Sequence, residues 1–332
     1  MALLLDEIRL TRDAIHYGFA VGKVRVLSTR LLDASAGERL IDAPSFAEQK
    51  RLLSDTPYGR FLESASTPEE VEAALDAALD SAYRFLDEAA LPAAVTRFFR
   101  VRADFRNLKG ALKAAALGAP LDGLLAEHGT IDTAAFSGEL TELPEPLGAL
   151  AAELQSAEGL DPAAIDTAVD AALFAELKRL AREAKSAYLG QIASLMVDLA
   201  NVKTMVRSRL AGLDAEQTAA LLLDGGSVER VRLTTLLELA PADLAGALER
   251  IEALKGIDAE GLLSADTLDP VTDAVLLRLL ARGRRGPEGP EPVIAYVFAR
   301  ENEVATLRVL LLGRLAGIDN DTLRARLRTG LR

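Results

Sequence analysis

The sequence predicts an all-α protein built from three related helical bundles. Half of the 332 residues are apolar, Ala and Leu dominate, only 5% are aromatic and Trp is absent. This composition favours helix over sheet. A polar motif within an apolar, helix-like stretch recurs along the chain, and glycine follows each copy where helices commonly end. These three observations together predict the fold class.

The clearest repeated element is a long helix with an acid and an amide near its middle. It is found at 101–120 as VRADFRNLKGALKAAALGAP and at 195–214 as LMVDLANVKTMVRSRLAGLD. Both copies read D-x-x-N, then an apolar residue, then Lys, with Gly eleven positions after the Asn. The first acids, Asp104 and Asp198, are 94 positions apart.

A second block, upstream of each copy, repeats at the same offset. VEAALDAAL at 71–79 matches IDTAVDAAL at 165–173, and their aspartates, Asp76 and Asp170, are again 94 positions apart. Two blocks with one offset indicate that a whole unit of helices was duplicated in register.

A third, weaker copy completes the series. LDPVTDAVL at 268–276 matches the upstream block, with Asp273 103 positions after Asp170, and 301–319 matches the downstream block at an offset of 105. We place the two extra residues in the Gly/Pro-rich loop 283–292, since such loops tolerate insertion. The matched residues are Glu303 with Asp198, Thr306 with Asn201, Arg308 with Lys203, and Gly317 with Gly212.

Helix start and stop signals fit these units. Thr67-Pro68-Glu69-Glu70 and Asp214 with Gln217 are typical helix starts. Gly129-Thr130-Ile131 and Gly226-Ser227-Val228 read as equivalent punctuation between units. We therefore predict three helical repeats at 1–130, 131–228 and 229–332. The helices are expected to end at Gly118, Gly212 and Gly317.

The repeated acids and amides fall within the apolar stripe of their helices. A buried carboxylate is costly unless it is hydrogen-bonded or paired, so we expect these side chains to fix helix packing, with Arg100 one candidate partner for Asp104. Alternatively, they line a concave surface that grips a partner. Because the third copy changes the chemistry and keeps the pattern, catalysis is disfavoured. The candidate packing or partner-contact residues are Asp104, Asn107, Asp198, Asn201, Glu303 and Arg308.

Composition excludes several functions. The net charge of −12 disfavours binding to nucleic acid, and the absence of Cys excludes disulfides and thiol chemistry. No apolar run reaches the roughly 20 residues of a membrane helix, and residues 1–13 lack the apolar core of a signal peptide. We predict no catalytic residue, no cofactor and no metal site. The basic run 278–286 is either a solvated loop flank or a contact for an acidic partner.

Five motifs occur in order along the chain. Three are YGFAVGKVRVLSTRLL (17–32), RLLSDTPYGRFL (51–62) and EPVIAYVFARENEVATLRVLL (291–311), and the other two are the repeated D-x-x-N helices. Together they resemble the C subunit of prokaryotic V-type and A-type ATPases, which is related to the d subunit of the eukaryotic V-ATPase. The segment 17–32 departs from the family pattern after Tyr17, where Phe19, Ala20 and Gly22 replace a more polar stretch.

The resemblance implies a fold and a role. It implies three bundles with approximate threefold symmetry in a funnel-shaped molecule. It also implies a non-catalytic rotor adaptor on the cytoplasmic side of the membrane, monomeric outside the complex. The expected partners are the central shaft and the membrane proteolipid ring, and the adaptor transmits torque for ATP-coupled proton or sodium transport.

Two rival interpretations stay open at this point. The first is an all-α repeat scaffold for another protein complex. The second is an all-α enzyme that uses a divalent cation held by some of the repeated acids, for which Asp76, Asp80, Asp104 and Asp198 are the candidates. Asp80 is replaced by Phe174 in the second copy, which favours a solvated helix face over a cation site.

Overall fold

All regular secondary structure in the described part of the chain is helical, which confirms the predicted all-α class. The structure is a computed structural model that describes residues 12–89, 91–121, 125–157, 162–255, 258, 261–286 and 289–326. Residues 1–11, which bear on the expectation of no signal peptide, lie outside this set. None of the helices searched in the described part is long and apolar enough to cross a membrane.

The chain divides into two compact units. The first contains the described parts of Met1–Pro92 and Leu277–Ile318, and the second those of Ala93–Leu276 and Asp319–Thr329. The three repeat boundaries stay a prediction.

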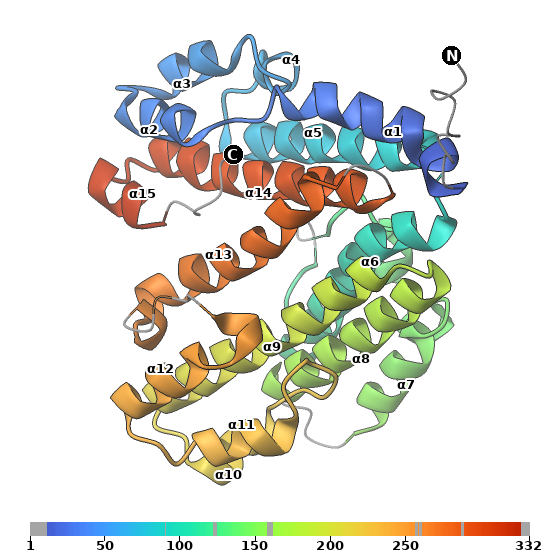
Figure 1. Cartoon of the computed structure of the whole chain (residues 1–332), viewed down its shortest axis with the longest axis vertical. Helices are drawn as coiled ribbons and strands as arrows, with labels where there is room; N and C mark the ends of the chain where they lie inside the picture. The colour runs from blue at the N-terminus through green and yellow to red at the C-terminus, as the bar shows by residue number, and fades with distance from the viewer. Residues whose placement is uncertain are drawn as a thin grey trace, which may run out of the picture. The chain divides into compact units, whose positions relative to one another are not determined.

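In the first unit, the long helices α5 and α14 pack together, and α1 packs on α14 (Figure 1). Leu75, Leu86, Leu307 and Leu311 are fully buried on the two long helices. The helices are α1 (Arg12–Ser28), α2 (Ala34–Asp42), α3 (Phe46–Leu53), α4 (Gly59–Leu62), α5 (Pro68–Glu88) and α14 (Glu291–Leu315).

In the second unit, α8 packs against both α6 and α9 (Figure 1). The α-helices are α6 (Ala93–Leu117), α7 (Leu147–Ser156), α8 (Pro162–Glu183), α9 (Ala187–Leu210), α10 (Ala215–Ala220), α11 (Arg230–Leu236), α12 (Pro241–Glu249) and α15 (Asn320–Arg326). Short 3₁₀ helices connect them: η1 (Thr133–Ser137), η2 (Leu140–Glu142), η3 (Glu252–Leu254) and η4 (Gly261–Leu263).

The division between the units falls within α13 (Ala265–Arg284). This helix extends past the predicted start of the 283–292 loop, and α14 begins before the predicted end. Pro292 occupies the first turn of α14, where the missing N–H costs no hydrogen bond, so the Gly/Pro-rich connection is shorter than expected.

The predicted helix ends are confirmed. Gly118, Gly212 and Gly317 have φ of 61°, 76° and 73°, a left-handed conformation that glycine adopts without steric cost. In each case the next N–H donates to a carbonyl five residues back at 2.9 Å, for example Ala119 to Ala114, which completes a Schellman cap. Both predicted helix starts form capping boxes, Thr67 with Glu70 and Asp214 with Gln217.

Candidate functional site

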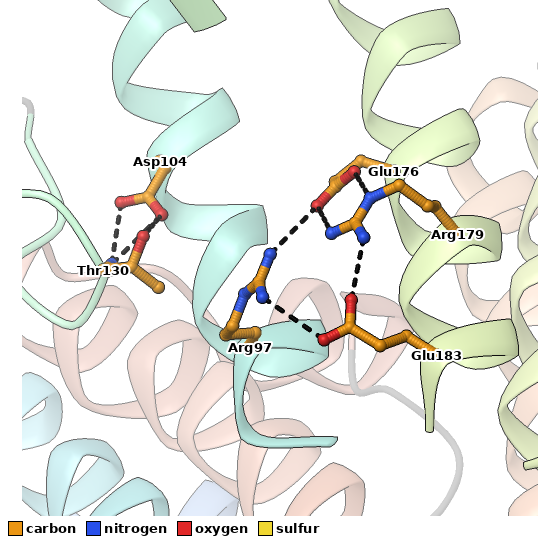
Figure 2. Close-up of polar contacts among 6 residues, drawn as sticks. All are labelled: Arg97, Asp104, Thr130, Glu176, Arg179 and Glu183. Atoms are coloured by element: carbon orange, nitrogen blue, oxygen red, sulfur yellow. Dashed lines mark hydrogen bonds and ion pairs between the residues drawn. The ribbon is translucent and has the colours of Figure 1, made fainter. Parts of the chain in front are cut away.

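The first repeated acid holds a loop against its own helix. Asp104 is fully buried on α6, and its carboxylate accepts hydrogen bonds from Thr130 N at 2.9 Å and Thr130 Oγ1 at 2.6 Å (Figure 2). It also accepts from Ile131 N at 3.1 Å. These donors belong to the predicted Gly-Thr-Ile punctuation. Arg100, the partner suggested by the sequence, donates to the carbonyl of His128, and its charge acts on Asp104.

The second acid repeats this geometry. Asp198 on α9 accepts from the backbone N–H and the hydroxyl of Ser227, and from Val228 N at 3.0 Å. Its punctuation segment therefore occupies the same position as the first. The duplicated sequence pattern corresponds to a duplicated contact between a helix and the loop that follows it.

The repeated amides complete the same contact. Asn107 accepts from Ala126 N at 2.8 Å and donates to Ala126 O at 2.9 Å, while Asn201 does so with Leu223 at 2.7 and 2.9 Å. A carboxamide carries one acceptor and one donor group side by side, so it satisfies both polar groups of one residue. Each amide thus provides hydrogen-bond partners for both the N–H and the C=O of a buried residue that lies outside a helix.

Glycine is required beside both carboxylates. A Cβ added to Gly129 would overlap Oδ1 of Asp104, and a Cβ added to Gly226 would overlap Oδ1 of Asp198. Neither glycine has a positive φ. Their requirement is therefore one of close approach rather than of backbone conformation.

In the third copy the acid contacts a distant part of the chain. Glu303 on α14 accepts from the backbone N–H of Leu32 and from the Tyr58 hydroxyl at 2.6 Å. Thr306, at the amide position, is buried and its hydroxyl has no hydrogen-bond partner among the described residues. The N-terminal segment thus takes the place of the following loop in this copy.

Burial dominates the electrostatics of Glu303 and Asp104. It raises the pKa of Glu303, against the opposing charge of Arg300, whose Nη1 lies 3.5 Å from the carboxylate. Burial also raises the pKa of Tyr58 well above its usual value. The pKa of Asp104 is raised for the same reason, although the hydrogen bonds from Thr130 oppose the shift.

Ion pairs connect the predicted repeats in succession. The cation two residues after each amide position pairs with the aligned aspartate of another repeat, first to second, second to third and third to first. The pairs are Lys109–Asp170 at 2.6 Å, Lys203–Asp273 at 4.0 Å and Arg308–Asp76 at 2.9 Å. The acid one turn earlier pairs with the same cation: Asp166 at 3.4 Å, Asp269 at 2.7 Å and Glu72 at 2.5 Å.

Each of these ion pairs lies within one compact unit, yet their order is cyclic in the repeat numbers. Every aspartate and cation of the three aspartate pairs lies in a repeated block of the sequence, but the repeats alone do not predict that these residues pair with one another. The signal that could have indicated this pairing is the similar offset at which the upstream block, with its aspartate, and the downstream block, with its cation, recur along the chain.

Sequence reasoning also missed a network between α6 and α8. Glu176, only 8% exposed, accepts hydrogen bonds from Arg179 Nε at 2.6 Å and Arg179 Nη2 at 2.7 Å. The guanidinium of Arg97 lies 3.7 Å from the same carboxylate (Figure 2). Glu183 bridges the two arginines at 2.7 and 3.5 Å. The spacing of Glu176, Arg179 and Glu183 is visible as a helical ion-pair pattern, but the partner on α6 is not.

The aspartates that the metal-enzyme hypothesis named each have a different partner. Asp76 pairs with Arg308, and Asp80 pairs with Arg84 at 3.0 Å. Across the described residues, no group of three or more His, Cys, Asp or Glu side chains is placed to hold a metal ion. Each of the four candidate acids therefore contacts its own partners, and the four do not converge on a common cation site.

Comparison with known proteins agrees with the motifs. The model of the family described as "ATP synthase (C/AC39) subunit" matches residues 20–326. The C subunit of the V-type ATP synthase of Thermus thermophilus is 29% identical over 90% of this chain and 94% of the relative. The C subunit of the A-type ATP synthase of Thermococcus kodakarensis is 26% identical over 89% and 86%, and that of the V-type sodium ATPase of Enterococcus hirae 23% over 92% and 96%.

The match covers nearly all of the sequence and extends into all three predicted repeats. It also confirms the prediction of an accessory subunit rather than a catalytic one. The chain belongs to the ATP synthase (C/AC39) subunit family, as its motifs predicted.

Proposed function

We propose that this chain is the non-catalytic rotor adaptor of a rotary V/A-type ATPase. It joins the central shaft to the membrane proteolipid ring and transmits torque for ATP-coupled proton or sodium transport. It lies on the cytoplasmic side of the membrane, attached through the complex, and is a monomer outside it. Family membership and the names of the relatives as C subunits of V-type and A-type ATP synthases and of a sodium ATPase support this proposal.

The observation that carries the proposal is the cyclic order of the ion pairs between repeats. Head-to-tail contacts that return to the first member are typical of closed rotational arrangements. We therefore propose that the repeats 1–130, 131–228 and 229–332 are quasi-equivalent bundles with approximate threefold symmetry, in a funnel-shaped molecule. Such an arrangement suits an adaptor that meets a ring on one side and a shaft on the other.

The buried anchors have a mechanical role in this proposal. Torque requires a part that resists deformation, and close-packed helices with satisfied polar contacts do so. We assign the repeated polar residues to packing of this frame rather than to partner contact. They are Asp104, Asn107, Asp198, Asn201, Glu303 and Arg308.

Co-purification tests the partners directly. The tagged chain is expressed in its own host, membranes are solubilised in mild detergent, and the recovered proteins are identified by mass spectrometry. We expect the proteolipid and the central-shaft subunits. Recovery of neither, with the chain running as a soluble monomer, would favour the general scaffold interpretation.

Loss of coupling tests the mechanism. Membrane vesicles depleted of the chain should hydrolyse ATP without pumping ions, and the purified chain should restore pumping. Arg308→Glu, which places a negative charge against Glu72 and Asp76, should restore less than Arg84→Glu, the same change at an exposed pair. Full pumping in the depleted vesicles would contradict the adaptor role.

A further inference from the structure

The first unit contains a pocket of about 730 Å³ whose walls come from four separate parts of the chain. Lys23 on α1 and Arg30 just after it form one side, Arg60 on α4 another, and Phe85 on α5 and Arg300 on α14 the rest. Three of the motif segments quoted above, 17–32, 51–62 and 291–311, meet here, and the proposed rotor role uses none of these lining residues. Ligand pockets commonly measure about 300–1,000 Å³.

The pocket is basic although the whole chain carries a net charge of −12. Four cations line it, against two carboxylates, Asp55 and Glu88. Glu88 is paired with Lys23 at 3.0 Å. Arg30 and Arg60 form no ion pair with a carboxylate of the described residues, so their charges remain available to a ligand.

The buried end of the pocket holds an arginine with an unused donor. Arg300 is 3% exposed, and its guanidinium stacks on the Tyr58 ring at 4.4 Å. Its single close carboxylate is Glu303, 3.5 Å from Nη1, and Nε has no hydrogen-bond partner in the described part. Leaving a charged donor buried and unbonded is costly, and an anion in the pocket would offset that cost.

An aromatic patch on α5 and α14 lies in the lining together with these cations. Phe85 and Tyr296 meet edge to face with centroids 6.1 Å apart, and Leu27 and Pro57 extend the apolar surface. A ligand with charged groups at one end and a flat or apolar part at the other would match both the cations and the aromatic patch.

We infer that this pocket binds a small phosphate ester carrying more than one negative charge. Its phosphates contact Arg30, Arg60 and Arg300, and its apolar part lies against Phe85 and Tyr296. Arginine rather than lysine provides the available charges, and the guanidinium fork matches phosphate oxygens in two-point contacts. The inference concerns the chain alone and does not depend on the rotor role.

Calorimetric titration of the full chain with pyrophosphate and with ATP, at constant ionic strength set with NaCl, tests this inference. We expect saturable binding, weakened about tenfold or more in Arg30→Gln and in Arg60→Gln, because each removes a charge-assisted hydrogen bond. Arg39→Gln is the matched control, since Arg39 is exposed on α2 outside the pocket. It should bind as the unsubstituted chain does.

Two further arms identify the ligand's source and the role of the buried arginine. Vesicles of anionic phospholipid, tested by flotation, separate a lipid headgroup from a soluble ester. Arg300→Lys keeps the charge and loses Nε, so it should weaken binding while thermal melting remains cooperative. If it does not fold, Arg30→Gln and Arg60→Gln carry the test. The inference would be overturned if neither pyrophosphate, nor ATP, nor the anionic vesicles bound the chain. It would also be overturned if all variants bound equally well.

Discussion

The anchors on α6 and α9 differ from the anchor on α14 in where their donors lie along the chain. Asp104 and Asp198 accept from loops 26 to 30 residues later, whereas Glu303 accepts from Leu32, 271 residues earlier. All three carboxylates accept a hydrogen bond from a backbone N–H. The type of contact is therefore the same, and only the position of the donor along the chain differs. The third copy has no downstream loop of this kind in the described chain, and the N-terminal segment provides it.

The difference has a chemical consequence. Each of the two aspartates accepts hydrogen bonds from backbone N–H groups and one hydroxyl of a single loop, and the charge of Arg100 also acts on Asp104. Glu303 has one backbone donor and lies beside the buried cation Arg300 and the Tyr58 hydroxyl. The third anchor is therefore an electrostatic cluster, and the first two are hydrogen-bonded caps on loops.

The largest expected effect is at the third anchor. Glu303→Ala should lower the free energy of unfolding by about 3–5 kcal/mol, because it leaves Arg300 buried without its partner. Glu303→Gln, which retains an acceptor, should cost less. Urea denaturation measures both, and equal stability of Glu303→Ala and the unsubstituted chain would remove the distinction between the anchors.

Removal of the aspartates should cost less than removal of Glu303. Asp104→Ala and Asp198→Ala each leave buried loop N–H groups unbonded, and we expect a loss of about 1–3 kcal/mol. The two losses should be similar, since the contacts are. Unchanged urea midpoints for both variants would mean that these side chains do not anchor the loops.

The close approach of Gly129 and Gly226 to the aspartate carboxylates can be tested by adding a methyl group at each glycine. Gly129→Ala and Gly226→Ala should destabilise by about 1–3 kcal/mol, because the new methyl group overlaps the anchoring carboxylate. Gly190→Ala on α9 is the control, since a Cβ there meets no neighbour. It should stabilise by about 0.5–1 kcal/mol. The same sign at all three positions would contradict the close approach.

Stability should also depend on pH through Glu303. Its pKa is raised by burial in the folded state above the ordinary 4.5, so the native state binds more protons than the unfolded state just above pH 4.5. This contribution to stability is complete below pH 4.5 and is lost as pH rises through the raised pKa. Urea denaturation across pH 4–8 should show a shallower decline in Glu303→Gln than in the unsubstituted chain.

The smallest effect is expected at the ion pairs between repeats. Lys109→Met and Lys203→Met should each change the free energy of unfolding by about 0–1 kcal/mol, because their aspartate partners are more than a third exposed or lie at the limit of contact. Thermal melting measures the change. Losses as large as those of the aspartate anchors would show that the ion pairs, rather than the caps, hold the repeats.

The helical class, the repeated blocks and the helix boundaries at Thr67, Gly118, Gly212 and Gly317 could all be predicted from the sequence. These features depend on local geometry: periodicity, capping side chains and a left-handed glycine act within a few residues of chain. The burial of the repeated acids could be predicted for the same reason, since the apolar stripe of a helix indicates which side faces the core.

Which side chains contact one another could be seen only in the folded chain. The pairing of Glu303 with Leu32 and Tyr58, the cyclic order of the ion pairs and the meeting of Arg30, Arg60 and Arg300 at one pocket all join positions far apart in the chain. No periodicity links such residues, because the partner of a buried polar group is chosen by how whole helices pack.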